Sequence, residues 1–117
     1  MASRGWTSRG RGAAKRTLYA GEWYASGAEA RYAAYLDLLL KGGRIVRWDR
    51  QVRWPLVVNG KKVCGMVPDF RVWLDDTRYE VHEVKGYEER EWRLKRKLFE
   101  ALHPDVPYVV VKAKDVP

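Results

Sequence analysis

Residues 68–86 read PDFRVWLDDTRYEVHEVKG and carry the strongest structural signal in the chain. Two runs of alternating apolar and polar residues flank a pair of aspartates, and the second run covers residues 79–85. This arrangement is typical of two strands joined by a turn. Because successive side chains of a strand point to opposite faces, Glu83 and Lys85 share one face. If the two strands pair as neighbours, Asp69 and Glu83 converge at their ends.

Two carboxylates side by side repel each other, and a hard divalent cation between them removes that repulsion. Mg²⁺ prefers oxygen ligands and is commonly held by one or two carboxylates together with a substrate phosphate. Lys85 would add a fixed positive charge where negative charge grows during phosphodiester cleavage, or orient the attacking water. The residue types therefore indicate metal-assisted hydrolysis of a phosphodiester.

The pattern also predicts a helix on each side of these strands. The first runs over residues 27–41, between the N-cap Ser26 and a Gly-Gly stop. The second runs over about residues 88–102 and is ended by Pro104. The expected core-facing positions are Ala33, Leu36 and Leu40 in the first helix and Leu94, Leu98, Ala101 and Leu102 in the second. Glu29 shares the apolar face of the first helix and is expected to point toward the edge of the core.

Strand patterns fill the rest of the chain. Asn59-Gly60 predicts a hairpin turn because both residues tolerate positive φ, and the second arm is expected to continue to Trp73. Residues 108–112 are mostly β-branched and indicate a last, buried strand. The order helix, three strands, helix, strand predicts an α/β fold with one mixed sheet flanked by helices.

The pair Pro68-Asp69 followed by Glu83-Val84-Lys85 resembles the signature of the PD-(D/E)xK nuclease superfamily. The order of the elements resembles the restriction-endonuclease-like core of that superfamily. The span from residue 24 to residue 112 is similar to a family of small phage proteins assigned to it. A looser similarity to Holliday-junction resolvases rests on small size, the acid on the first helix and the same core order.

The resemblance implies a DNA endonuclease that leaves 5′-phosphate and 3′-hydroxyl ends. It implies Mg²⁺ or Mn²⁺ bound by Asp69 and Glu83, with the Val84 carbonyl as a further ligand. Members often carry one more acid on the first helix, and Glu29 stands in that place, binding the metal directly or through water. Lys85 is the fourth catalytic residue that the resemblance implies.

The charge of the chain favours a nucleic-acid partner. The 117 residues form one expected domain, and 23 basic against 15 acidic residues leave a net charge of +8. Residues 1–16 are expected to form a flexible basic arm before a nuclease domain over residues 17–117. The expected phosphate contacts on the second helix are Arg90, Arg93, Arg96 and Lys97. So small a chain has little room for a separate domain that reads the base sequence of DNA. This favours structure-selective cutting of branched DNA, as in recombination, by a two-fold dimer.

The cysteine content and the lengths of the apolar runs indicate the cellular compartment of the protein. Cys64 is the only cysteine, so no intrachain disulfide forms, which agrees with a reducing compartment such as the cytoplasm. No apolar run approaches the roughly 18 residues that a membrane helix needs. We therefore expect no membrane partner.

Several alternatives stay open from the sequence alone. Ser26-x-x-Glu29 is also a capping box, in which Glu29 stabilises its helix and binds nothing else. Asp69 also suits an ordinary turn, Glu83 a cross-strand ion pair, and Lys85 a solvated strand end. A separate alternative for the whole chain is a non-catalytic nucleic-acid-binding module with a nuclease-like fold.

Overall fold

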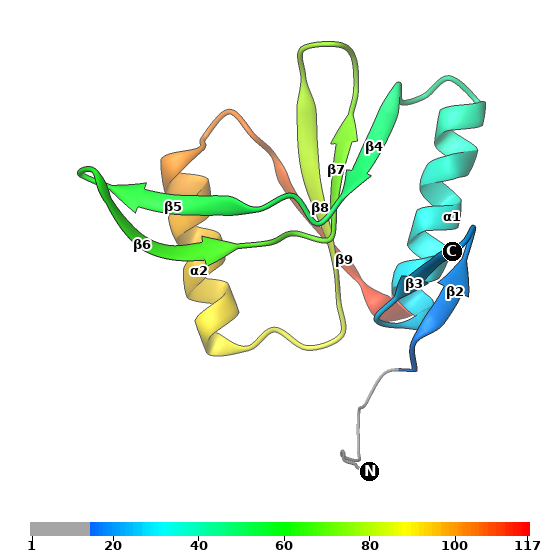
Figure 1. Cartoon of the computed structure of the whole chain (residues 1–117), viewed down its shortest axis with the longest axis horizontal. Helices are drawn as coiled ribbons and strands as arrows, with labels where there is room; N and C mark the ends of the chain where they lie inside the picture. The colour runs from blue at the N-terminus through cyan, green and yellow to red at the C-terminus, as the bar shows by residue number, and fades with distance from the viewer. Residues whose placement is uncertain (1–14) are drawn as a thin grey trace.

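The computed structural model describes residues 15–117 and contains two helices and eight strands in that range (Figure 1). The elements are β2 (Thr17–Tyr19), β3 (Glu22–Tyr24), α1 (Gly27–Lys41), β4 (Arg47–Arg50), β5 (Trp54–Val58), β6 (Lys61–Met66), β7 (Phe70–Trp73), β8 (Tyr79–Lys85), α2 (Arg90–Leu102), β9 (Tyr108–Lys112) and the 3-10 turn η1 (Ala113–Asp115). Residues 1–14 of the predicted basic arm lie outside the described residues.

The central sheet has the strand order β4-β7-β8-β9. The pairs β4–β7 and β7–β8 are antiparallel, whereas β8 and β9 run parallel. A parallel pair needs a crossover connection, and α2 supplies it. The predicted mixed sheet with helices is therefore confirmed, and the chain is a mixed α/β protein. No helix within residues 15–117 is long and apolar enough to cross a membrane.

Two hairpins lie outside the central sheet. β5 and β6 pair through Asn59 and Gly60, whose φ angles are 51° and 78°, so the predicted turn is confirmed. The expected continuous strand from this turn to Trp73 is wrong, because β6 ends at Met66 and β7 belongs to the central sheet. Pro68 lies in the break, and a proline has no N–H for a sheet ladder. The β2–β3 hairpin was not foreseen.

The core lies on both faces of the central sheet. On one face α1 packs Ala33 and Leu36 against Phe70 and Val72. On the other face α2 packs Phe99 against Val81, Leu56, Met66 and Tyr108. The central sheet therefore lies between the two helices, which fix the positions of its strands.

The helix boundaries agree better with the prediction than the buried faces do. α1 covers residues 27–41, with Ser26 as its N-cap, as predicted. In α2 the predicted apolar stripe is wrong at Leu94, which is 68% exposed, and at Ala101, which is also exposed, but it is confirmed at Leu98 and Leu102. The residues that pack inward from α2 are Trp92, Leu98, Phe99 and Leu102. Leu40 of α1 is also exposed, and Leu39 packs in its place.

Candidate active site

Asp69 and Glu83 lie next to each other where β7 begins and β8 approaches its end. The β7–β8 register pairs Phe70 with His82, so the residues one step further along each strand are Asp69 and Glu83. Asp69 Oδ2 accepts a hydrogen bond of 2.9 Å from the Val84 amide, which holds its carboxylate against β8. The structure therefore brings together the two acids that the sequence pattern had singled out.

Glu29 joins these acids from the first turn of α1. Its amide donates to Ser26 Oγ at 3.1 Å, and its Oε1 accepts from the Ala25 amide at 3.3 Å. These bonds resemble a capping box, shifted by one residue at the returning bond. The same carboxyl lies beside Asp69 and raises the pKa of that acid. Glu29 thus both caps its helix and belongs to the carboxylate cluster.

The electrostatics of the cluster disfavour the ionised form of Asp69. Burial, then the hydrogen bond and charge of Glu29, raise the pKa of Asp69 well above its usual range, and the charge of Glu83 adds to this. The Val84 amide acts in the opposite direction but is outweighed. Carboxylate oxygens that lie close together in a partly buried place are donors that a hard divalent cation suits.

Both oxygen atoms of the Glu83 carboxylate contact other side chains of the protein. Glu83 Oε1 accepts a hydrogen bond from the Tyr108 hydroxyl, and Glu83 Oε2 lies 3.5 Å from Lys85 Nζ. Within residues 15–117, no three His, Cys, Asp or Glu side chains already surround a common point as a metal site would. These acids are therefore neighbours, but among the described residues their side chains do not already form a three-ligand metal site.

Lys85 is fixed by two neighbours. Besides its ion pair with Glu83, its Nζ lies 4.7 Å from the centre of the Trp92 ring, a cation–π contact. Burial and the Glu83 carboxylate raise the pKa of Tyr108, so its hydroxyl remains a donor to that carboxylate. Tyr108 and Trp92 were missed in the sequence because only the parallel β8–β9 pairing and the α2 crossover bring them to the site.

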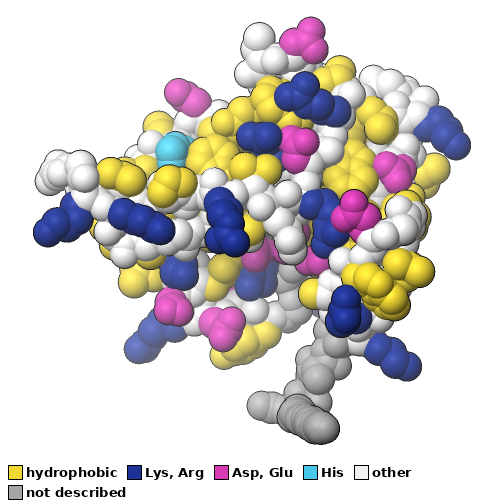
Figure 2. Space-filling model, in the orientation of Figure 1, with side chains coloured by type: hydrophobic (Ala, Val, Ile, Leu, Met, Phe, Trp, Pro, Cys, Tyr) yellow, Lys and Arg dark blue, Asp and Glu magenta, His cyan; other side chains and the backbone are white. Residues whose placement is uncertain are grey.

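The four predicted basic residues of α2 differ in their exposure to solvent. Arg90, Arg93 and Lys97 are exposed, and Arg93 donates to the Glu88 carbonyl at 3.1 Å. Arg96 instead packs over the rings of Trp92 and Tyr108 and lies 3.7 Å from Glu100. On the face of the molecule in Figure 2, Lys and Arg side chains are spread among apolar and acidic ones.

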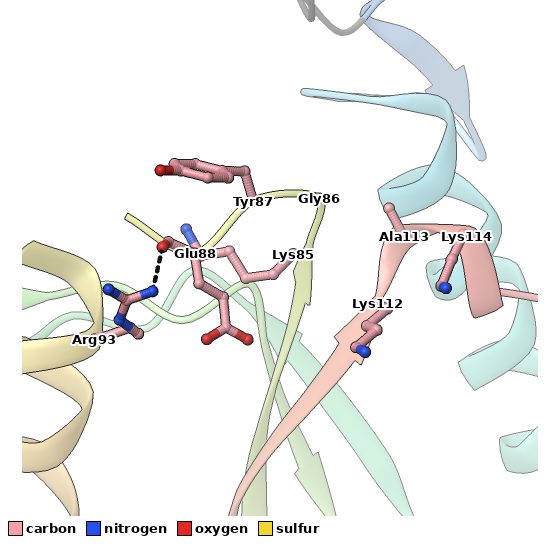
Figure 3. Close-up of a pocket in the computed structure, with 8 residues that line it drawn as sticks. All are labelled: Lys85, Gly86, Tyr87, Glu88, Arg93, Lys112, Ala113 and Lys114. Atoms are coloured by element: carbon pink, nitrogen blue, oxygen red, sulfur yellow. Dashed lines mark hydrogen bonds between the residues drawn. The ribbon is translucent and has the colours of Figure 1, made fainter. Parts of the chain in front are cut away.

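A basic pocket of about 610 Å³ adjoins the cluster (Figure 3). Its cationic side chains are Lys85, Arg93, Lys112 and Lys114. The last two were not singled out in the sequence, since Lys112 at the end of β9 and Lys114 in η1 lie far from Lys85 along the chain. The pairing of β8 with β9 brings this part of the chain to the same hollow.

Comparison with known proteins gives one family. The chain matches the model described as "Protein of unknown function (DUF1064)" over residues 9–116. No curated protein and no solved structure matches it. Because the family model covers nearly the whole sequence, the chain belongs to the DUF1064 family of proteins of unknown function.

Proposed function

We propose that this chain is a metal-dependent DNA endonuclease of the PD-(D/E)xK type, with a restriction-endonuclease-like core. One observation carries the proposal: Asp69 lies beside both Glu29 and Glu83, and the ammonium group of Lys85 lies 3.5 Å from the Glu83 carboxylate. A purely structural role leaves this cluster unexplained, because neighbouring carboxylates destabilise the fold unless a proton or a cation compensates them.

The donor set fits Mg²⁺ or Mn²⁺. Asp69 and Glu83 would hold the ion, with the Val84 carbonyl as a further ligand and Glu29 as a ligand directly or through water. When bound, the ion supplies a polarised scissile phosphate and a water of lowered pKa. The Asp69 hydrogen bond to the Val84 amide and the Glu29 hydrogen bond to the Ala25 amide restrict both acids before any ligand arrives.

Lys85 contributes the fixed positive charge of the site. Its Nζ is held between the Glu83 carboxylate and the Trp92 ring, and it faces the basic pocket. An ammonium group preorganised in this way stabilises negative charge that develops on the phosphate without a cost of reorganisation. Tyr108 and Trp92 are positioning residues, which act through Glu83 and Lys85.

DNA is the proposed substrate, and branched DNA the preferred form. The net charge of +8 favours a polyanion. The described domain consists of the central sheet, two helices and two small hairpins, which leaves little surface to read base sequence. Recognition of shape at a four-way junction by a two-fold dimer fits this size.

The experiment is cleavage of labelled linear, flapped and four-way DNA in Mg²⁺ or in EDTA. We expect Mg²⁺-dependent cleavage by the unmodified chain, fastest on the junction, and loss of at least a hundredfold in rate for Lys85→Ala, as for a donor at a developing oxyanion. Lys41→Ala, which removes an exposed charge in the last turn of α1, should cleave as the unmodified chain does.

Two results would point elsewhere. Equal rates on linear duplex and junction would contradict structure selectivity and leave the nuclease assignment in place. If neither the unmodified chain nor Asp69→Ala cut any DNA, although the unmodified chain bound it, the protein would be a non-catalytic nucleic-acid-binding module.

A further inference from the structure

The basic pocket beside the carboxylates is built from segments that are far apart in the sequence. Figure 3 shows the end of β8 and Arg93 of α2 on one side, with Lys112 and Lys114 on the other. The lining contains four cationic side chains and one acidic side chain, Glu88. The pocket thus opens from the active site along the end of β9.

Three of the four cations lack an acidic partner among the described residues. Lys85 pairs with Glu83, but Arg93 donates only to a backbone carbonyl, which carries no net charge. Among the ion pairs found within residues 15–117, none involves Lys112 or Lys114. The hollow therefore holds a surplus of positive charge.

The register of the sheet brings two of these lysines to the same end of neighbouring strands. Lys85 of β8 is the register partner of Lys112 in the parallel strand β9, and Lys114 follows in η1. Positive charges from separate segments of the chain therefore line one hollow, which favours a bound anion.

We propose that this pocket binds the sugar-phosphate backbone of the DNA strand beside the phosphate that is cut, with Lys112 and Lys114 each contacting a phosphate. The inference rests on the proposed nuclease function, because the pocket shares Lys85 with the active site. Contacts of this kind position DNA without reading its bases. They extend the substrate surface from α2 to the end of β9.

The test measures binding of a fluorescent four-way junction and a linear duplex to the full chain in EDTA at several salt concentrations. Lys112→Gln/Lys114→Gln should weaken binding to both DNAs about tenfold to a hundredfold and reduce the slope of log K against log salt by about 2. Lys112→Arg/Lys114→Arg should bind as the unmodified chain does, because it keeps both charges.

The matched control is Lys41→Gln/Arg44→Gln, which removes two exposed charges at the C-terminal end of α1. In Figure 1 this end lies away from η1, which lies near the first turns of the same helix. The control should change the salt slope by much less than the pocket variant. Circular dichroism establishes that each variant is folded.

The outcomes separate this inference from the nuclease proposal. If the pocket variant binds DNA with the affinity and salt slope of the control, the pocket assignment is overturned, even where Mg²⁺-dependent cleavage is found. If the unmodified chain cuts no DNA but the pocket variant alone loses binding, the nuclease proposal fails and the phosphate contacts of Lys112 and Lys114 stand.

Discussion

At the scale of single residues, Asp69 is a carboxyl whose charged form is disfavoured by its surroundings. Its carboxylate is partly buried beside Glu29 and Glu83. Burial and both neighbouring acids disfavour its charged form and raise its pKa. A fold that keeps such a group gains nothing from it in the absence of a cation. Perturbed pKa values of this kind are typical of functional sites, and the packing of the rest of the protein compensates the lost stability.

Asp69→Asn should stabilise the metal-free protein and abolish cleavage. The amide oxygen can still accept from the Val84 amide, and the amide nitrogen can donate to Glu29. We expect the free energy of unfolding to rise on the order of 1 kcal/mol near neutral pH, measured by urea denaturation in EDTA. Asp76→Asn, in the exposed turn before β8, should change neither stability nor cleavage.

The same residue predicts a pH dependence. A carboxyl whose pKa is raised on folding stabilises the protein below its unfolded-state pKa, and this contribution is lost as pH rises through the folded-state value. In EDTA, the unmodified chain should therefore lose stability relative to Asp69→Asn as pH increases above about 4. Parallel stability curves for the two proteins would contradict the raised pKa of Asp69.

Tyr108→Phe should weaken metal binding at the proposed site, because it removes the hydroxyl that holds the Glu83 carboxylate. It keeps the ring that packs against Phe99 but removes the hydroxyl that donates to the buried carboxylate. We expect a loss of about 1 to 3 kcal/mol in stability, and a tenfold or greater rise in the Mg²⁺ concentration for half-maximal cleavage. Tyr35→Phe, in a partly buried tyrosine of the opposite core, is the control. An unchanged Mg²⁺ requirement would remove the positioning role of Tyr108.

At the scale of elements, the start of α1 serves both the helix and the site. Ser26 caps the helix through the Glu29 amide, and the Glu29 side chain accepts from the Ala25 amide and lies beside Asp69, whose pKa it raises. The sequence left capping and ligand binding as alternatives. The structure shows the capping bonds, which use the amide and Oε1 of Glu29. Ligand binding by the same carboxyl is compatible with them and is part of the proposed function.

Two substitutions separate these roles. Ser26→Ala should lower stability by about 1 kcal/mol and leave the cleavage rate unchanged, since it removes only the N-cap bond. Glu29→Gln can still accept from the Ala25 amide but loses its charge, so stability should hold while cleavage falls at least tenfold. If Glu29→Gln cleaved like the unmodified chain, Glu29 would only cap its helix.

Local patterns in the sequence predicted the elements well. The α1 boundaries, the Asn59-Gly60 turn and the β8 and β9 strands follow from capping, turn chemistry and alternation, which are short-range effects. The break between β6 and β7 did not follow, although Pro68 marks it. Alternation continues across the break, and which strands pair is decided by tertiary packing rather than by neighbours in sequence.

At the scale of the whole molecule, the parallel β8–β9 pair completes the site. It brings Tyr108 to Glu83 and Lys112 beside Lys85, across a crossover that includes all of α2. The acids and Lys85 were predicted because they fall within one hairpin and one capped helix. Tyr108, Trp92, Lys112 and Lys114 were not, because the pairing of distant strands leaves no local trace in the sequence.

The most direct test of the account is the rate of junction cleavage by the unmodified chain and by Asp69→Asn over a range of Mg²⁺ concentrations, with both proteins shown to be folded. The account predicts that the unmodified chain cuts DNA only when Mg²⁺ or Mn²⁺ is present. It predicts that Asp69→Asn, although at least as stable, is slower by a hundredfold or more. Cleavage by Asp69→Asn at the unmodified rate, or cleavage that persists in EDTA, would contradict it.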